Sequence, residues 1–257
     1  SAEEAGESIR ALLSDTNMLF ITAGFGGGTG TGASPVIAKI AKEMDILTVG
    51  VVTKPFEWEG EERSALAEEG LQDLEQHVDS LIVIPNDRLQ SLGERITLFN
   101  AFQAANEVLL NSVQGIVELV TVPGVINLDF ADVKAVMGKK GRSIMGSSVA
   151  SGPDRARLAI EQAINSPLLE DISLDGASGI LLNVTVANDI EVSEFNQIGA
   201  ILKSYTKNKA KVIAGTSLSR DLEDDSIRVT LVATGLNTEK SNKNKEENRE
   251  RSFDDLD

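Results

Sequence analysis

NMLFITAGFGGGTGTG, residues 17–32, is the stretch that decides the fold. It joins a short apolar run, Asn17–Ala23, to a turn-rich loop, Gly24–Gly32, that contains six glycines and two threonines. The following residues, Ala33–Met44, carry apolar side chains at helical spacing, and Pro35 comes early enough to lie in a first turn. A strand, a glycine loop and a helix in this order favour a loop whose backbone N–H groups bind an anion at the helix N-terminus.

The composition of the glycine loop indicates which kind of anion site it forms. Glycine loses more backbone entropy on folding than any other residue, so six glycines between rigid apolar elements favour a phosphate cradle over a merely flexible turn. A Walker A loop ends in Gly-Lys-Ser/Thr, whereas Gly32 is followed by Ala33 and the next lysine is Lys39. The sequence therefore excludes a P-loop.

A dinucleotide site is the alternative that this loop leaves open. Gly28, Gly30 and Ala33 match the loose fingerprint G-x-G-x-x-A. That fold has an acidic residue at the end of the next strand to bind the ribose, but here the strand ends in Thr53-Lys54. An NAD-dependent oxidoreductase therefore stays as the weaker hypothesis.

The rest of the chain predicts an α/β fold in two parts. Apolar strands about thirty residues apart, with helices between them, indicate βαβ units around a parallel sheet. A helical pattern over 97–121, roughly 37 Å long, leads into a smaller α+β domain with a mixed sheet. The strands that we expect are 17–23, 46–52, 80–84, 141–151, 179–187, 211–216 and 227–234, and the further helices are 1–13, 59–76, 154–165 and 191–205.

Composition excludes several functional classes. The 257 residues include no cysteine and one histidine, His77, which excludes disulfides, thiolate sites and a Ser-His-Asp triad of ordinary kind. A net charge of −16 argues against nucleic acid as a partner, and no apolar run is long enough to insert in a membrane. We expect a soluble, cytoplasmic protein.

Several motifs together resemble a known family. GGGTGTG after an apolar strand resembles the signature of the tubulin/FtsZ superfamily, and VVTKPFEWEG, LFNAFQAANEVL, GVINLDFADVK and SPLLEDISLDGA are similar to its FtsZ family. The resemblance implies a tubulin-like fold and a GTPase that polymerises head to tail into filaments of the cell-division ring. The domains that it implies are a partial GTP-binding domain (1–96), a central helix (97–121), a synergy loop (122–132), a C-terminal activation domain (133–236) and a disordered charged tail (237–257).

The resemblance also assigns GTP or GDP contacts to eleven residues. Without it, Glu59 and Arg63 form an ordinary i,i+4 surface pair, and Phe102 is a core residue. Glu107 stands where many members of the family carry aspartate. In the order phosphate, sugar and base, the contacts are Gly26, Gly27, Gly28, Thr29, Gly30 and Thr31; Glu59 and Arg63; and Phe102, Asn106 and Glu107.

A second motif, residues 127–132, is the one to which the resemblance assigns GTP hydrolysis. From the residues alone, Asp129 is a helix N-cap and Asp132 lies at N3, where the helix dipole favours a negative charge. The resemblance implies that both aspartates reach the γ-phosphate of the neighbouring subunit's GTP and position the attacking water, with Asn127 as a hydrogen-bond partner. Mg²⁺ is expected on the phosphates, because the sequence offers no dedicated metal cage.

The remaining expectations concern partners and completeness. The resemblance implies self-assembly at mid-cell and, in the intact protein, division-site adaptors and regulators. The family's N-terminal strand and first glycine-rich loop are missing, and RSFDDLD does not match its adaptor peptide. We therefore expect the isolated chain to fold marginally and bind GTP poorly, with an inactive fragment as an alternative. The presence of Asp129 and Asp132 argues against a non-hydrolysing structural relative.

Overall fold

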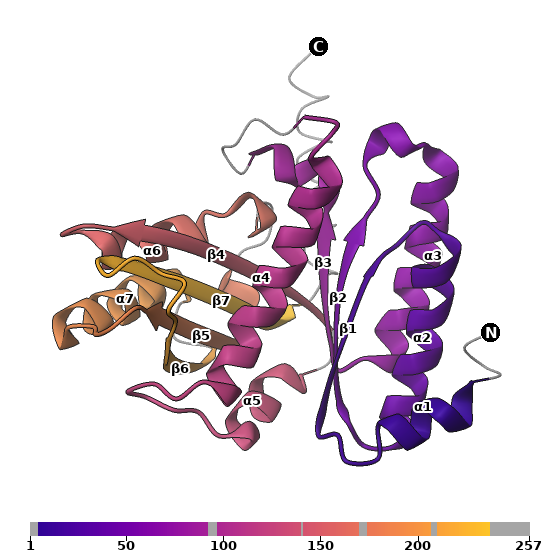
Figure 1. Cartoon of the computed structure of the whole chain (residues 1–257), viewed down its shortest axis with the longest axis horizontal. Helices are drawn as coiled ribbons and strands as arrows, with labels where there is room; N and C mark the ends of the chain where they lie inside the picture. The colour runs from indigo at the N-terminus through magenta and orange to yellow at the C-terminus, as the bar shows by residue number, and fades with distance from the viewer. Residues whose placement is uncertain (1–4, 92–96, 140, 170–173, 207–209, 237–257) are drawn as a thin grey trace, which may run out of the picture.

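The computed structural model describes residues 5–91, 97–139, 141–169, 174–206 and 210–236 (Figure 1). The predicted tail, 237–257, and the first residues of the predicted N-terminal helix lie outside the described residues.

Three parallel strands and three helices form the first half of the fold. The middle strand is buried from Leu47 to Thr53, because helices cover both of its faces, and this explains why its sequence is an unbroken apolar run. The elements are α1 (Gly6–Leu12), β1 (Met18–Gly24), α2 (Gly28–Glu43), β2 (Leu47–Lys54), α3 (Glu61–His77) and β3 (Ser80–Pro85).

The second half adds four strands to the same sheet. The strand order is β1-β2-β3-β4-β7-β5-β6, in which β7 is antiparallel to both of its neighbours and β5–β6 is parallel, so the predicted α/β architecture with a mixed second part is confirmed. The two halves join at only two register pairs, Leu81 with Arg142 and Ile82 with Ser143. The elements are β4 (Arg142–Ser151), α6 (Arg155–Ile164), β5 (Gly179–Val186), α7 (Val192–Tyr205), β6 (Lys211–Leu218) and β7 (Ser226–Leu236).

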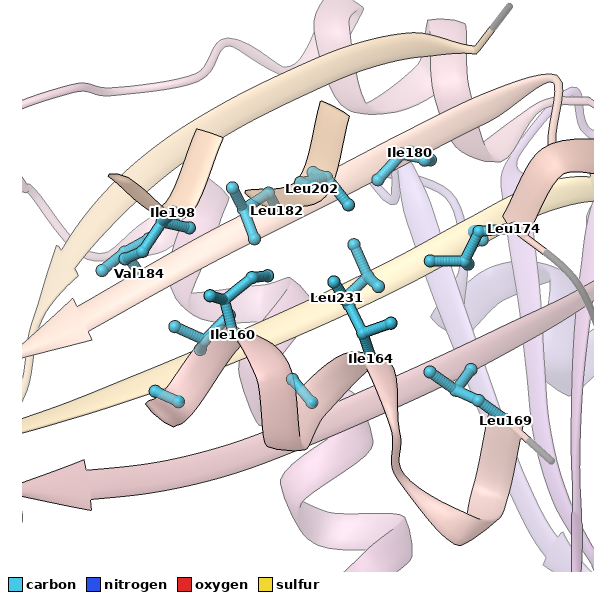
Figure 2. Packing of buried hydrophobic residues seen from close by; sticks show 14 of the residues in the cluster. Ile160, Ile164, Leu169, Leu174, Ile180, Leu182, Val184, Ile198, Leu202 and Leu231 are labelled. Atoms are coloured by element: carbon cyan, nitrogen blue, oxygen red, sulfur yellow. The ribbon is translucent and has the colours of Figure 1, made fainter. Parts of the chain in front are cut away.

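Helices α6 and α7 cover one face of this second half. Their apolar side chains, among them Ile160, Ile164, Ile198 and Leu202, pack onto β5 and β7, as Figure 2 shows. The other face belongs to α4 (Ala101–Thr121) and α5 (Phe130–Met137). Short 3₁₀ turns lie at Glu57–Glu59, Asn86–Ser91, Pro167–Leu169 and Leu174–Gly176.

Helix α4 packs against both halves of the sheet. One hydrophobic cluster contains Val49 and Val51 from β2, Ile116 from α4, and Leu181 and Val232 from the second half. With 21 residues, α4 spans about 31 Å. It runs from the edge where β1–β3 end down to α5 (Figure 1), so it fixes the distance between those two places.

Two expected helix starts were wrong. Helix α2 begins inside the glycine loop, at Gly28, because first-turn residues need only helical dihedrals and no intrahelical N–H partners. Pro35 is consequently the eighth residue of α2 rather than a first-turn residue. The central helix begins at Ala101 instead of residue 97, because the Asn100 side-chain oxygen accepts hydrogen bonds from the N–H and hydroxyl of Thr97 and closes a turn there.

A buried ion pair fastens α4 to the second half of the sheet. Arg228 of β7 donates to both carboxylate oxygens of Glu118 at 2.8 Å, and both side chains are largely buried. The same carboxylate accepts from Thr185 at 3.1 Å and from Gln114 at 2.7 Å. Buried charges are tolerated when they are paired and their remaining lone pairs are satisfied, as they are here.

Replacing Arg228 by leucine should therefore lower the free energy of unfolding by about 3–5 kcal/mol, because Glu118 would stay buried without its cation. The double variant Glu118→Gln, Arg228→Leu should recover much of this loss, since glutamine carries no charge. Urea unfolding measures both. The exposed Arg157, which pairs with Asp154 and Glu161, provides the control, and Arg157→Leu should cost less than about 1 kcal/mol. Equal losses at Arg228 and Arg157 would contradict the assignment.

A second ion pair ties α6 to α7 and makes stability depend on pH. The Arg155 guanidinium donates to the two carboxylate oxygens of Glu194 at 2.7 and 2.9 Å, and this hydrogen bonding lowers the pKa of Glu194. Since the folded pKa lies below the unfolded value of about 4.3, the pair stabilises the fold above that pH, and the stabilisation is lost as the pH falls through the folded pKa.

Glu194→Gln should accordingly have a lower urea midpoint than the parent at pH 7, and the difference should close as the pH falls below about 4.3. Glu62→Gln controls for the loss of one surface charge, because Glu62 is exposed and forms no ion pair within the described part of α3. A difference that stays constant down to pH 3 would show that the pair's charge does not matter.

Candidate functional site

The glycine loop lies where β1 ends, and two of its glycines are needed for packing. Gly26 has a φ of +95°, and a Cβ there would lie 2.8 Å from the carbonyl oxygen of Arg63. A Cβ on Gly30 would lie 2.5 Å from the carbonyl oxygen of Gly24. Any larger residue at either position would push the loop away from its neighbours.

Three other glycines of the loop have no such neighbours. A Cβ on Gly27, Gly28 or Gly32 would meet no atom within 4 Å. Gly27 is the N-cap of α2 and no side chain caps this helix, so its first-turn N–H groups are unpaired. Thr31 supports the turn by accepting a hydrogen bond from the N–H of Gly26 at 2.9 Å. Open space beside the positive end of a helix dipole is suited to an anion.

The predicted sugar pair lies directly beside this loop. Glu59 has a side chain only 7% exposed; it accepts from the backbone N–H of Phe56 at 2.9 Å and from Arg63 at 2.6 Å. Arg63 is 56% exposed in its side chain, and its backbone oxygen is the one that approaches Gly26. Glu59 is thus fixed by the fold, whereas the guanidinium extends to the surface.

An aromatic cluster adjoins the pair and presents two half-exposed rings. Phe56 is buried, whereas Trp58 is 54% and Phe102 51% exposed. Their ring centroids lie 5.3–5.9 Å apart, with Phe102 edge-on to both other rings. The expectation that Phe102 is a core residue, drawn without the resemblance, was therefore wrong. Trp58 was missed, although it is the chain's only tryptophan and lies within the EWEG motif.

The other residues predicted to contact the base lie on the first turns of α4. Asn106 is one turn after Phe102 and exposed, and Glu107 accepts a hydrogen bond from Gln103 at 3.0 Å. The glycine loop, the Glu59–Arg63 pair and the start of α4 are thus linked by direct contacts at the edge where β1–β3 end.

The aspartate loop is built separately, at the other end of α4. Asp129 is the N-cap of α5 and its side chain accepts from the N–H of Asp132 at 2.9 Å, so the predicted N-cap is confirmed. Asn127 accepts from the N–H of Gly124 at 2.7 Å. Ile126 holds the loop onto β6 through two hydrogen bonds with Thr216, at 2.8 and 2.9 Å.

The two groups are not brought together within one chain. The aspartate loop follows the last turn of α4 and the aromatic ring of Phe102 belongs to its first turn, so the helix separates them by roughly 30 Å. In Figure 1, α5 lies near the C-terminal end of α4, far from the N-terminal end of that helix.

Two further properties bear on the chemistry. Within the described ranges, no group of three or more His, Cys, Asp or Glu side chains is placed to hold a metal ion. No helix in that part of the chain is long and apolar enough to cross a membrane.

Gly28 and Gly30 provide a matched test of stability, because a Cβ would have open space at Gly28 and a steric clash at Gly30. Gly28→Ala should raise the free energy of unfolding by about 0.5–1 kcal/mol, because alanine favours the helix and meets no atom within 4 Å. Gly30→Ala should lower it, because its Cβ would press on the Gly24 carbonyl. Urea unfolding of both variants beside the parent checks this, and a loss of stability in Gly28→Ala would contradict it.

Comparisons with known proteins agree with this arrangement. The family model "Tubulin/FtsZ family, GTPase domain" matches residues 1–94, and "FtsZ family, C-terminal domain" matches residues 141–237. The cell division protein FtsZ of Coxiella burnetii is 54% identical over 237 residues, 92% of this chain and 61% of that protein. That of Wigglesworthia glossinidia brevipalpis is 53% identical over 241 residues, 93% of this chain and 62% of that protein. The chain thus spans about three fifths of these relatives' length.

Solved structures give the same result. An FtsZ dimer from M. jannaschii superposes with a TM-score of 0.87 at 46% identity, covering 91% of this chain and 68% of that one. CetZ2 from Haloferax volcanii, solved as a GTPγS-bound protofilament, has a TM-score of 0.74 at 20% identity, covering 98% and 77%, and shows the fold alone. On its identity to FtsZ along most of its length, the chain belongs to the tubulin/FtsZ family.

Proposed function

We propose that this chain binds and hydrolyses GTP as part of a cytoskeletal protein whose copies polymerise head to tail into filaments of the cell-division ring. The matched GTPase-domain family and the relatives named as cell division proteins support this proposal. So does the dimer recorded for the FtsZ structure from M. jannaschii.

The observation that carries the proposal is the separation of the two half-sites by the length of α4. A glycine cradle at one end and an aspartate loop at the other cannot meet in one chain. Stacking copies head to tail would place the aspartate loop of one copy on the cradle of the next. Such a heterologous contact repeats without closing and generates a filament.

On this proposal, the cradle binds the phosphates. The unpaired first-turn N–H groups of Gly28, Thr29 and Gly30 donate to phosphate oxygens, and the open space beside Gly27 leaves room for the chain of phosphates. Thr29 and Thr31 add hydroxyl groups to the same turn, and Gly26 keeps the loop against α3.

The neighbouring residues bind the nucleoside. Glu59, held in place by the Phe56 N–H, and the exposed Arg63 guanidinium contact the sugar. Phe102 offers a half-exposed ring for the base, and Asn106 one turn later offers an amide. The carboxylate of Glu107 accepts from the guanine N1–H and N2–H, in exchange for its bond with Gln103.

The aspartate loop completes the site for hydrolysis. Asp129 uses one carboxylate oxygen as the N-cap, which leaves the other to accept from a water, and Asp132 is fixed one helical turn further along. Positioning the attacking water and balancing charge are the main tasks in phosphoryl transfer. Asn127, oriented by Gly124, shapes the loop that carries both aspartates.

Mg²⁺ fits this site only through the nucleotide. The described residues offer no cluster of acidic or histidine ligands, so the phosphates themselves would hold the ion. Bound in that way, it would offset the negative charge of the phosphates. In the cell, we place the filament at mid-cell, where adaptors and regulators of division would bind it.

A mixing experiment tests the shared site. Gly28→Asp should abolish phosphate binding by repulsion without unfolding the chain, because an acidic residue suits a first helical turn. Asp132→Asn should abolish hydrolysis and leave GTP binding unchanged. Phosphate release from GTP with Mg²⁺ should be absent in each variant alone. In an equal mixture it should return to about a quarter of the parent rate, the share of contacts that combine one intact cradle with one intact aspartate loop.

The control is an equal mixture in which both proteins carry Asp132→Asn, one of them with Gly28→Asp as well, which should stay inactive. Failure of the two single variants to restore hydrolysis in each other, while Asp132→Asn still binds GTP, would show that the site functions within one chain.

The NAD-dependent alternative gains no support from the structure. At the end of β2, where a ribose-binding acid is required, Lys54 forms an ion pair with Glu68 at 2.8 Å. A cation already neutralised by its neighbour cannot bind the ribose hydroxyls as a carboxylate does.

A further inference from the structure

A groove lies between α7 and the outermost strand of the second half, on the face of the sheet opposite α4 and α5. It has a volume of about 270 Å³. Phe195 and Leu202 from α7 and Val212 and Ala214 from β6 form its sides, with Leu182 of β5 at its base. Figure 2 shows Leu182 and Leu202 side by side where the helix meets the strand.

The strand that borders this groove has a free edge. The N–H of Lys211 donates to Ser178 at the start of β5, whereas the N–H of Thr216 donates away from β5, to Ile126. Strand geometry alternates, so the N–H and C=O groups of Val212 and Ala214 also point outward. No backbone partner for these groups is found among the described residues. An apolar groove beside an open edge is suited to an extended peptide.

The rim of the groove is basic. Lys203 of α7 lines the groove and is exposed, and it forms no ion pair within the described ranges. In a chain with a net charge of −16, an unpaired lysine beside an apolar groove favours an acidic occupant.

We propose that the groove binds the chain's own segment Phe253–Leu256. Residues 237–257 contain only two apolar side chains, Phe253 and Leu256, and three aspartates surround them, Asp254, Asp255 and Asp257. Phe253 enters the groove, the aspartates face Lys203, and the main chain on either side of Phe253 uses the open edge of β6.

The tether permits this contact. Gly179 of β5 pairs with Thr234 of β7 on one side and with Lys211 of β6 on the other, so β7 ends about 10 Å from the start of the groove. The 17 residues from Leu236 to Phe253 have a root-mean-square reach of roughly 23 Å when flexible. Tethering at this distance gives a millimolar effective concentration, so a modest intrinsic affinity is enough. The bound segment covers an edge that is otherwise open to pairing with other chains.

Because the chain contains no cysteine, only two introduced thiols can form an intramolecular disulfide. The double variant Val212→Cys, Ser252→Cys, made in the chain of residues 1–257, places one thiol in the groove and one beside the proposed anchor. Under mild oxidation at low protein concentration, it should form an intramolecular disulfide, detected by mass spectrometry. Adding Phe253→Ala keeps the tether and both thiols unchanged and should slow the reaction about tenfold, through the loss of apolar burial.

Two further measurements test the electrostatic contribution and the integrity of the strand. Lys203→Glu should slow the disulfide in the same background, and added salt should slow it only when Lys203 is present. The thermal midpoint of Val212→Cys alone shows that the strand is intact. An unchanged rate with Phe253→Ala would overturn the proposal. So would disulfides that form only between molecules, at a rate that rises with protein concentration, because the occupant would then be a second copy.

Discussion

The ion pair between Glu118 and Arg228 is the contact on which the placement of everything else depends. Helix α4 packs on the first half of the sheet through an apolar cluster, and apolar contacts constrain the exact position of a helix less than directed hydrogen bonds do. On the second half, it is held by a carboxylate with two bonds from one guanidinium and further bonds from Thr185 and Gln114. One guanidinium nitrogen contacts both carboxylate oxygens, and together with the bonds from Thr185 and Gln114 this tolerates little sliding, so the pair fixes the register of α4 on the sheet.

A close backbone approach strengthens the same contact. A Cβ on Gly115 would lie 2.6 Å from the Thr230 side chain, and the Gly115 carbonyl accepts from Asn183 at 3.0 Å. The helix therefore lies directly on the strands at the glycine, one turn before the carboxylate. Because the halves of the sheet share only two register pairs, it is α4 that sets their relation. This contact therefore sets the distance between the cradle at one end of α4 and the aspartate loop at the other.

Local signals were enough to predict much of this fold. Continuous apolar runs such as β2 mark strands buried on both faces, and Asp129 needs only its neighbour Asp132 to form an N-cap. The errors arose where distant contacts decide. Glycine disfavours helix, yet α2 begins at Gly28, and the loop before it packs against the Arg63 carbonyl of α3. Trp58 gave no periodic signal, and Glu118 and Arg228 are 110 residues apart in the sequence. Which side chains meet across a sheet depends on register, which local pattern does not determine.

The glycines of the loop also distinguish structural constraint from function. Gly26 and Gly30 are explained by contacts that any side chain would disturb, and a stable fold alone requires them. Gly27, Gly28 and Gly32 are different, because alanine would fit and would lose less entropy on folding. Selection for stability alone would favour alanine at Gly28 and Gly32 and a Ser, Thr, Asp or Asn cap at Gly27. Their glycines make sense if something outside the chain approaches the backbone there, and a phosphate lying against the first turn of α2 is such a group. The feature that stability does not explain is thus the one that the proposed GTP site requires.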